Sequence, residues 1–421
     1  MKINNRVILA ASIYLTVLGL AGVFSAKQPA SVAAPKAEPP PSKQASDPVV
    51  NTKLVAANTR LSFKLFSEIL KQQSNENIFI SPASVAIALD MIYGGANGKT
   101  QQAIAQTLEL QGMSPQEINQ ANSVLKTSLN NPDPKVQLSI ANSLWAREGE
   151  PFKPEFMQII QNVYQADVKK LNFGHSTASS MINSWVRQST QGKIEKIVDE
   201  IEPNTVFVLL NAIYFKGNWT EPFAKEATQS RPFNLLNGTQ KLHPMMRQQK
   251  LGYFPYYENE LFRAISLPYG KGRLSMYIFL PNPGVSLKTF YASLNAENWH
   301  KWMDQFSPYE GGINVTLPRF KVEYTVELKE ALKSLGMEIA FGKEADFSAM
   351  TASSLWLSKV KHKTFVEVNE EGTEAAAVTQ GGGVRSGPIE MTMDHPFFFA
   401  IRDNQTETIL FVGSIVEPKE N

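Results

Sequence analysis

Residues 370–379 read Glu-Glu-Gly-Thr-Glu-Ala-Ala-Ala-Val-Thr, and Gln-Gly-Gly-Gly-Val-Arg-Ser-Gly follows at 380–387. Just before them, residues 365–368 (Phe-Val-Glu-Val) alternate apolar and polar side chains as a half-buried strand does, and Gly372 then lets the backbone leave that strand. Every second residue beyond this glycine is small and uncharged, namely Thr373, Ala375, Ala377, Thr379, Gly381 and Gly383. A segment with such a face can enter a crowded sheet without a steric or desolvation penalty. The stretch therefore predicts a loop that can become a strand.

The same residues have a second interpretation as the start of a helix. Thr373 is a fair helix cap, and the three alanines at 375–377 are the strongest helix formers. Taken alone, the stretch fits both interpretations equally. The strand pattern at 365–368 favours the loop that can become a strand.

The composition sets loose bounds on function. The chain has 421 residues and a net charge of +2, from 41 basic and 39 acidic residues, so no overall field favours nucleic acid or an anionic surface. It has no cysteine, which excludes disulfides, thiolate metal sites and a cysteine nucleophile. A chain of this length can bury enough apolar surface to fold without disulfides, so the absence of cysteine leaves the compartment open.

Residues 1–26 have the pattern of a signal peptide or a membrane anchor. Two basic residues within the first six precede an uncharged run of apolar and small residues that ends at Ala26. Residues 27–50 are rich in proline and alanine and predict a disordered spacer. We expect the folded part, residues 51–421, to be extracytoplasmic. It would be secreted or periplasmic after cleavage, and anchored to the membrane through residues 1–26 without it.

Beyond residue 50 no second linker or internal repeat is visible, so a single domain is expected. Apolar residues recur at helical spacing from Leu54 to Ile69, Ser81-Pro82 opens a helix that stops at Gly94-Gly95, and Ser114-Pro-Gln-Glu117 has the spacing of a capping box. Strands are predicted at Val206–Leu210, Leu274–Leu280, Ile313–Leu317, Phe365–Val368, Phe397–Ile401 and Ile409–Val412. Helices concentrate in the first half and strands in the second, which predicts an α+β fold with antiparallel or mixed sheets.

The sequence carries no catalytic signature. None of the five histidines has metal-ligand spacing, and no G-x-S-x-G elbow is present. The glycines at 381–383 are not followed by the Lys-Ser/Thr of a phosphate-binding loop. We therefore expect no cofactor, no metal and no enzymatic activity, and any chemistry would be performed by a partner.

Five segments, in order along the chain, resemble the serpin family of serine protease inhibitors. They are Asn77-Ile-Phe-Ile-Ser-Pro-Ala-Ser84, Leu210-Asn-Ala-Ile-Tyr-Phe-Lys-Gly-Asn-Trp219, Leu317-Pro-Arg-Phe-Lys-Val-Glu-Tyr324, the stretch at 370–379, and Met393-Asp-His-Pro-Phe-Phe-Phe-Ala-Ile401. The resemblance extends from roughly residue 52 to the end of the chain. It implies a serpin fold with a large mixed or antiparallel central sheet, smaller sheets and an exposed reactive-centre loop.

The resemblance also implies an inhibitory mechanism. The hinge of the loop would be Glu370, Glu371, Gly372, Thr373, Glu374, Ala375, Ala376, Ala377, Val378 and Thr379. A target serine protease would cleave after Arg385 or Ser386, and the hinge would then insert into the central sheet and trap the covalent acyl-enzyme. Spacing from Glu370 selects Ser386, whereas spacing from Pro396 selects Arg385. We favour Arg385 and a trypsin-like target, because an arginine fills an acidic primary pocket, whereas Ser386 suits only a small, elastase-like pocket. The alternative for Arg385 is a loop arginine without a role.

Further residues match the family's sheet-opening positions. These are Ser81, Ser84, Asn211 and His362, a polar cluster under the central sheet, and Trp219, at the top of the sheet where the hinge enters. Their alternative roles are helix caps, a satisfied buried histidine and a core aromatic. We expect a metastable monomer that melts at higher temperature after cleavage and that can form loop-sheet polymers. The alternatives are a non-inhibitory binding or chaperone protein of the same fold, and a surface protein that proteases merely cleave.

Overall fold

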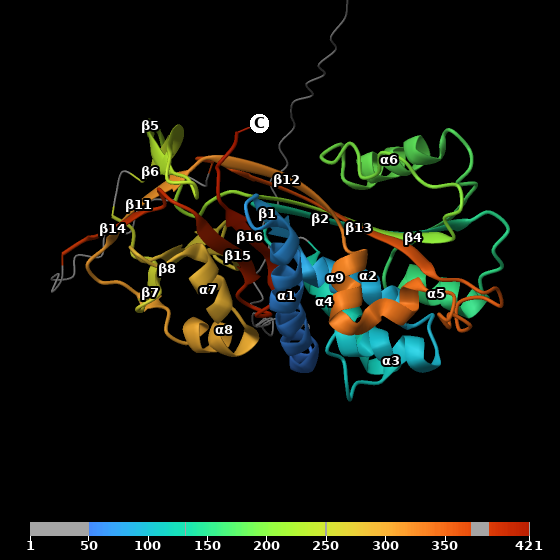
Figure 1. Ribbon diagram of the computed structural model, residues 1–421. Helices are drawn as coiled ribbons and strands as arrows, with labels where there is room; N and C mark the ends of the chain where they lie inside the picture. Colours follow the sequence, from blue (N-terminus) through green and yellow to red (C-terminus); the bar gives the residue numbers. More distant parts are fainter. Residues whose placement is uncertain (1–49, 131, 249–250, 372–386, 421) are drawn as a thin grey trace, which may run out of the picture. The chain divides into compact units, whose positions relative to one another are not determined.

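The computed structural model describes residues 50–420 except 131, 249–250 and 372–386 (Figure 1). The predicted segment 1–26 and residues 27–49 of the predicted spacer lie outside the described residues, so their interpretation stays a prediction. No described helix is both long and apolar enough to cross a membrane.

The first two helices are present where the sequence predicts them, and the second begins at its predicted cap. α1 (Thr52–Gln73) follows Asn51, whose side chain accepts hydrogen bonds from the first backbone N–H groups of the helix. α2 (Pro82–Tyr93) follows Ser81, has proline in its first turn and ends before Gly94. Every residue of α2 is buried, so this helix lies in the centre of the fold.

The other helices are shorter or more peripheral. α4 (Pro115–Leu129) has the predicted capping box, with both hydrogen bonds between Ser114 and Glu117 formed. The remaining α-helices are α3 (Gly98–Thr107), α5 (Pro154–Asn162), α6 (Ala178–Ser189), α7 (Leu287–Ser293), α8 (Ala296–Met303) and α9 (Lys329–Leu332).

The central sheet has five described strands in the order β12-β13-β4-β2-β3. They are β12 (Phe320–Glu327), β13 (Leu357–Val368), β4 (Phe207–Gly217), β2 (Val136–Arg147) and β3 (Asp167–Leu171). β13 pairs with β4, and β2 with β3, in parallel, whereas β12 pairs with β13, and β2 with β4, antiparallel. The sheet is therefore mixed, as predicted.

Two further sheets complete the fold. One has the order β1-β16-β15-β9-β8-β7-β10 and the other the order β14-β11-β6-β5. The first contains β1 (Ile78–Ile80), β16 (Ile409–Ile415), β15 (Phe397–Asp403), β9 (Leu274–Pro281), β8 (Phe262–Tyr269), β7 (Pro255–Glu258) and β10 (Ser307–Pro308). The second contains β14 (Ile389–Thr392), β11 (Ile313–Pro318), β6 (Gln240–Arg247) and β5 (Ala224–Asn234).

Helices cover both faces of the central sheet (Figure 1). Leu209 and Ile213 of β4 belong to the main core, which also holds the apolar residues of α2. Val208 and Leu210 belong to a second core together with residues of α6. This alternation follows from the two-residue period of a strand, and it points Asn211 toward the α2 side.

The predicted strands are present, but the central ones are longer than expected. β4 continues to Gly217 and β13 begins at Leu357, well before the predicted start at Phe365. In β13, lysines alternate with the buried residues Val360, His362 and Thr364. Because two of these three buried residues are polar, the alternation of apolar and polar residues that predicts a strand is not visible here. β2 and β3 were not predicted, and they bring strands into the helical first half of the chain.

Candidate functional site

The boundary between β13 and β4, called the seam below, is closed by direct pairing. The two strands run parallel from Leu357 opposite Phe207 to Val366 opposite Phe215. Because each strand is the immediate neighbour of the other, a segment that enters the sheet here must first separate them.

Five polar side chains lie together across the seam and are called the polar row. Asn142 of β2, Asn211 of β4 and His362 of β13 are direct partners in the register of the three strands. Partner positions point to the same face of a sheet, and here they meet Ser81 and Ser84 at the start of α2. All five are buried, with 6% exposure at Asn142 and at most 1% at the others.

The hydrogen bonds identify His362 as a neutral ring. The backbone N–H of Ser81 donates to His362 Nε2 over 2.9 Å, so Nδ1 carries the ring proton and donates to Asn211 Oδ1. Complete burial lowers the pKa of His362 to about 3. The ring therefore stays uncharged at neutral pH.

Asn211 is the centre of the polar row. Its Nδ2 donates to Asn142 Oδ1 at 2.6 Å and to Ser84 Oγ, while its Oδ1 accepts from His362. Ser81 Oγ donates to the Leu410 carbonyl at 2.6 Å and accepts from the backbone N–H of Ser84. Ser81 is thus a helix cap and a member of the row at the same time, so both interpretations from the sequence describe its contacts.

Residues 369–371, called the hinge base, follow directly after β13. The carboxylate of Glu370 is 4% exposed, and its two oxygens share the single N–H of Arg319 Nε, at 2.7 and 2.9 Å, while Arg319 Nη2 lies 2.6 Å from Oε1. It also accepts a hydrogen bond from the hydroxyl of Thr228. Burial alone would raise the pKa of Glu370, but the bonds from Arg319 and Thr228 outweigh burial and hold this pKa below its usual value.

Trp219 holds the backbone of the hinge base. Its backbone N–H donates to the Glu371 carbonyl at 3.0 Å, and its indole Nε1 donates to the Asn369 carbonyl at 2.8 Å. The indole stacks on Tyr269 with ring centroids 4.3 Å apart. Lys216 forms an ion pair of 2.8 Å with Glu371 and lowers the pKa of that carboxyl. Trp219 is therefore both a core aromatic and a direct contact of the hinge base.

The rest of the predicted site lies outside the described residues. This applies to Gly372, Thr373, Glu374, Ala375, Ala376, Ala377, Val378, Thr379, Arg385 and Ser386. Their roles stay predictions. Among the described residues, no group of three or more His, Asp or Glu side chains could hold a metal ion.

Four residues of the site were not predicted from the sequence. Asn142 and Thr228 lie on strands that were not predicted, so no sequence signal marked them. Arg319 and Lys216 lie inside two of the five segments quoted for the resemblance, but only the pairing of distant strands brings them to Glu370 and Glu371.

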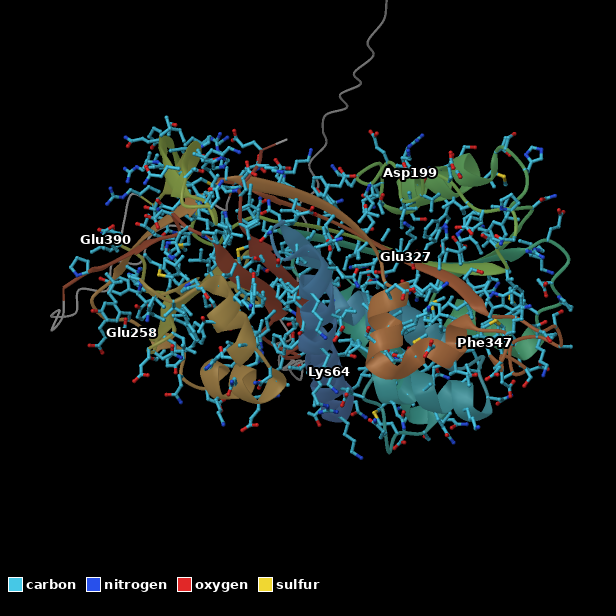
Figure 2. The ribbon with its side chains drawn as sticks, in the orientation of Figure 1. Lys64, Asp199, Glu258, Glu327, Phe347 and Glu390 are labelled. Carbon is cyan, nitrogen blue, oxygen red and sulfur yellow. The ribbon has the colours of Figure 1, made fainter. Side chains whose placement is uncertain are left out.

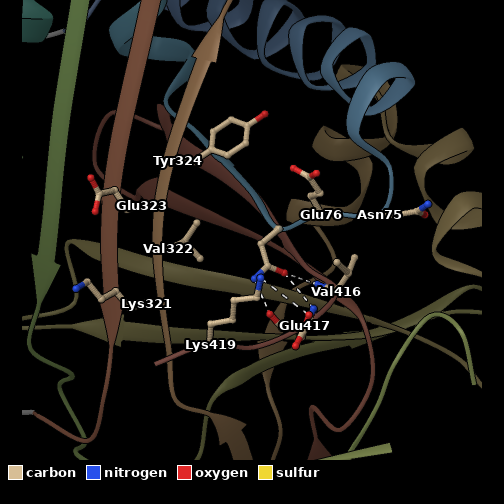
Figure 3. Close-up of a pocket in the computed structure, with 10 residues that line it drawn as sticks. Asn75, Glu76, Lys321, Val322, Glu323, Tyr324, Val416, Glu417 and Lys419 are labelled. Carbon is tan, nitrogen blue, oxygen red and sulfur yellow. Dashed lines mark hydrogen bonds and ion pairs between the residues drawn. The ribbon is translucent and has the colours of Figure 1, made fainter. Parts of the chain in front are cut away.

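A small hollow of about 370 Å³ lies between the end of α1, β12 and the C-terminal segment (Figure 3). Asn77 lies on its wall and holds that segment, because its Oδ1 accepts from the N–H groups of Val416 and Glu417 and its Nδ2 donates to the Glu417 carbonyl. The side chains around the hollow carry both signs of charge. Asn77 thus fixes the C-terminal segment beside the end of α1.

Comparisons with known proteins identify the fold. A family profile described as serpin (serine protease inhibitor) matches residues 56–418. Human leukocyte elastase inhibitor is 38% identical over 378 residues, which are 87% of this chain and 99% of that protein. The native structure of the thermophilic serpin tengpin has a TM-score of 0.80 and 31% identity, and the match covers 89% of this chain and 96% of tengpin. Human thyroxine-binding globulin, solved with its hormone, has a TM-score of 0.79 and 29% identity, with 87% of this chain and 99% of that chain covered.

These matches, together with the mixed central sheet and its flanking helices, define the architecture as the serpin fold. The chain belongs to the serpin family. It is accordingly an inhibitor of serine proteases and not an enzyme.

Proposed function

We propose that the chain inhibits its target as a suicide substrate, with the seam as the place where its own hinge inserts. The observation that carries this proposal is the position of the hinge base, which continues β13 directly at the end of the seam. A chain that continues from β13 through the hinge base needs only to fold back to lie between β13 and β4. The small residues of the predicted hinge suit such a narrow entry.

The covalent step uses the chemistry of the protease. The hydroxyl oxygen of the protease serine attacks the carbonyl carbon of Arg385, while the protease histidine takes the hydroxyl proton. The peptide bond to Ser386 then breaks, and the histidine gives that proton to the leaving amine of Ser386. An ester joins Arg385 to the protease, and insertion of the freed hinge follows before water can hydrolyse the ester.

Insertion requires the polar row to rearrange. When β13 and β4 part, the bond between His362 and Asn211 has to break, because these side chains belong to the two separating strands. Both groups are neutral, so parting the strands leaves no buried charge. The row can therefore open and close again around an inserted strand at moderate cost.

Two bonds remain candidates for cleavage. Arg385-Ser386 suits a trypsin-like protease with an acidic primary pocket. Ser386-Gly387 suits an elastase-like protease with a small pocket, and the likeness to leukocyte elastase inhibitor favours this second bond. We keep Arg385-Ser386 as the proposal, because only arginine has a charged pocket to fill.

The place of action follows from the N-terminal pattern. We propose that residues 1–26 export the chain, so that the inhibitor meets its proteases outside the cytoplasm. Cleavage of this segment would release a free inhibitor, and retention would keep it at the membrane surface.

The test is to mix the full chain with trypsin at equal molarity and, in parallel, with an elastase-type protease. We expect a band at the summed mass that survives SDS, and N-terminal sequencing of the released peptide to begin at Ser386. If the released peptide began at Gly387 instead, the cleaved bond would be Ser386-Gly387. Clean cleavage with full residual protease activity across a wider protease panel would overturn the proposal.

A second candidate is a non-inhibitory binding protein of the same fold. The likeness to thyroxine-binding globulin, whose structure contains a bound hormone, favours keeping it. It predicts that no protease forms a covalent complex and that the intact and cleaved chains melt at the same temperature.

A further inference from the structure

Among the described residues, two exposed apolar side chains lie unusually close together in the sequence and beside the end of the loop. The large apolar side chains that are exposed are Met181, Leu236, Leu242, Leu251 and Tyr253. Leu251 is 41% and Tyr253 51% exposed, whereas Gly252 and Phe254 between and after them are buried. The alternation shows an extended segment that presents one apolar face to solvent.

This segment is fixed rigidly to the place where the described chain resumes after the loop. Gly252 and Ile313 exchange backbone hydrogen bonds of 3.0 and 2.8 Å, and Ile313 is the register partner of Ile389 on β14. The Tyr309 backbone N–H donates to the Phe254 carbonyl at 3.2 Å, and the Tyr309 hydroxyl donates to the Gly387 carbonyl at 3.1 Å. Leu251 and Tyr253 are thus held at a set distance from the first residues after the loop.

The distance can be estimated from the strand spacing. Two spacings of about 4.8 Å, one on each side of Ile313, separate Gly252 from Ile389 by about 10 Å. Arg385 lies four residues before Ile389, which adds at most about 14 Å of extended chain, so the proposed bonds lie at most about 24 Å from Gly252. A specific protein interface covers about 800 Å² on each partner, equal to a disc about 32 Å across. One interface of ordinary size can therefore include both the cleaved bond and the pair Leu251 and Tyr253.

The surroundings match the anatomy of a binding surface. Pro388 is exposed near the pair, and the neighbouring carboxylate of Glu390 already has partners, because it accepts from Asn314 at 2.6 Å and forms an ion pair with Arg247 at 3.8 Å. Figure 2 shows Glu390 at the rim of the molecule. An apolar centre inside a satisfied polar rim is the arrangement in which aromatic residues contribute most to protein binding.

We propose that Leu251, Tyr253 and Pro388, named the Tyr253 patch, form a second contact surface for the target protease, beside the cleaved bond. The patch would bind an apolar part of the rim of the protease's active-site cleft, with the Tyr253 hydroxyl available for one hydrogen bond. It selects the protease and speeds docking, and it takes no part in cleavage or trapping. This inference rests on the proposed function, because it takes the loop to be the substrate.

The first experiment measures docking without chemistry. Trypsin and an elastase-type protease, each with the active-site serine replaced by alanine, are titrated with the full chain, and the dissociation constant is measured by calorimetry. The variant is Leu251→Ser with Tyr253→Ser. The control is Leu242→Ser, because Leu242 is 71% exposed on β6 and lies away from Gly387. We expect at least a fivefold weaker binding for the double variant and no change for the control, as expected for loss of an aromatic anchor.

The second experiment measures trapping with the active proteases. We expect the double variant to show the same proportional decrease in the second-order inhibition rate, but an unchanged number of inhibitor molecules consumed per protease trapped. Equal binding of wild type and double variant would overturn the patch and leave the suicide-substrate proposal intact. Patch-dependent binding without any covalent complex would overturn the suicide-substrate proposal and leave the patch. Absence of binding to both inactive proteases would overturn the patch as a docking surface. Thermal unfolding of each variant confirms that the fold is unchanged.

Discussion

The proposed hinge insertion would disturb both the polar row and the hinge base, and these two regions are stabilised by different kinds of interaction. In the row, five buried side chains without formal charge share hydrogen bonds around Asn211. At the hinge base, Glu370 and Glu371 are each paired with a cation, and the cations Arg319 and Lys216 are about one third exposed. The row is neutral and buried, whereas the hinge base is charged and partly exposed to solvent.

Because of this difference, we expect the two regions to oppose insertion to different extents. Interrupting a buried neutral network is costly, because removing one member leaves each of its partners unsatisfied in the interior. A charged pair that water reaches loses less, because solvent replaces part of the interaction. We therefore expect the row to dominate the stability of the closed sheet and the hinge base to respond to salt.

The largest effect should come from removing the centre of the row. Asn211→Ala leaves the ring N–H of His362 without an acceptor and two oxygens, on Ser84 and Asn142, without a donor. At about 1–3 kcal/mol for each unsatisfied buried group, we expect a loss of about 3 kcal/mol or more in the free energy of unfolding. Urea unfolding measures it. Asn142→Ala, which removes one bond at the edge of the row, is the matched control and should cost about 1 kcal/mol. Equal losses for both variants would contradict a central role of Asn211.

Lowering the pH should reduce the free energy of unfolding through the two regions at different pH values. Burial lowers the pKa of His362 from 6.5 to about 3, so the unfolded chain binds a proton that the folded chain does not. The free energy of unfolding therefore falls as pH falls from 6.5 toward 3, by at most about 1.4 kcal/mol per pH unit. The pKa of Glu370 lies below its usual 4.5, so its contribution is lost only below that value.

The measurement is urea unfolding at pH values between 7 and 4.5, for the wild type and His362→Gln. We expect about 2 kcal/mol of pH-dependent loss in this window to disappear in the variant. Asp90 has the opposite effect, because burial raises its pKa to about 7 and its protonation stabilises the fold as pH falls. Only the difference between the two proteins isolates His362, and parallel pH profiles would show that the ring titrates normally.

The resemblance predicted four members of the row, all but Asn142, but not the geometry that joins them. Helix caps are local, so Ser81 and Ser114 could be predicted from neighbouring residues alone. The contact between His362 and Asn211 joins residues 151 positions apart, and only the parallel register of β13 and β4 creates it. Resemblance to a family supplied that pairing, because no local pattern contains it.

The hinge base shows the same limit in a different way. Glu370 and Trp219 were predicted from the resemblance, whereas Arg319 and Thr228 were not. Nothing in the sequence tells which arginine meets a given glutamate, since charge pairs across sheets carry no periodicity. β2 was missed because its partly buried positions carry Leu138 and Ile140 as well as polar residues, which blurs the alternation.

Loss of the buried charge pair at the hinge base should have an intermediate effect. Arg319→Met keeps most of the aliphatic stem but leaves the carboxylate of Glu370, 4% exposed, with only Thr228 as a side-chain donor. We expect a loss of about 1–2 kcal/mol, below the full cost of orphaning a buried charge because Arg319 itself is 34% exposed. The double variant with Glu370→Gln should recover part of this loss, since it removes the unpaired charge. Lys301→Met, in a largely exposed pair with Glu297, is the control and should change nothing measurable.

The smallest effect should come from the outer pair of the hinge base. Lys216 and Glu371 are 33% and 45% exposed, so water screens their 2.8 Å contact and Lys216→Met should cost less than about 0.5 kcal/mol. Half-molar salt should abolish even this difference, whereas the effect of Asn211→Ala should not change with salt. The backbone bond from Trp219 to the Glu371 carbonyl does not depend on Lys216, so the hinge base should stay in place. If Lys216→Met cost as much as Arg319→Met, the hinge base would behave as one cooperative unit like the polar row, and the contrast between the two regions would fail.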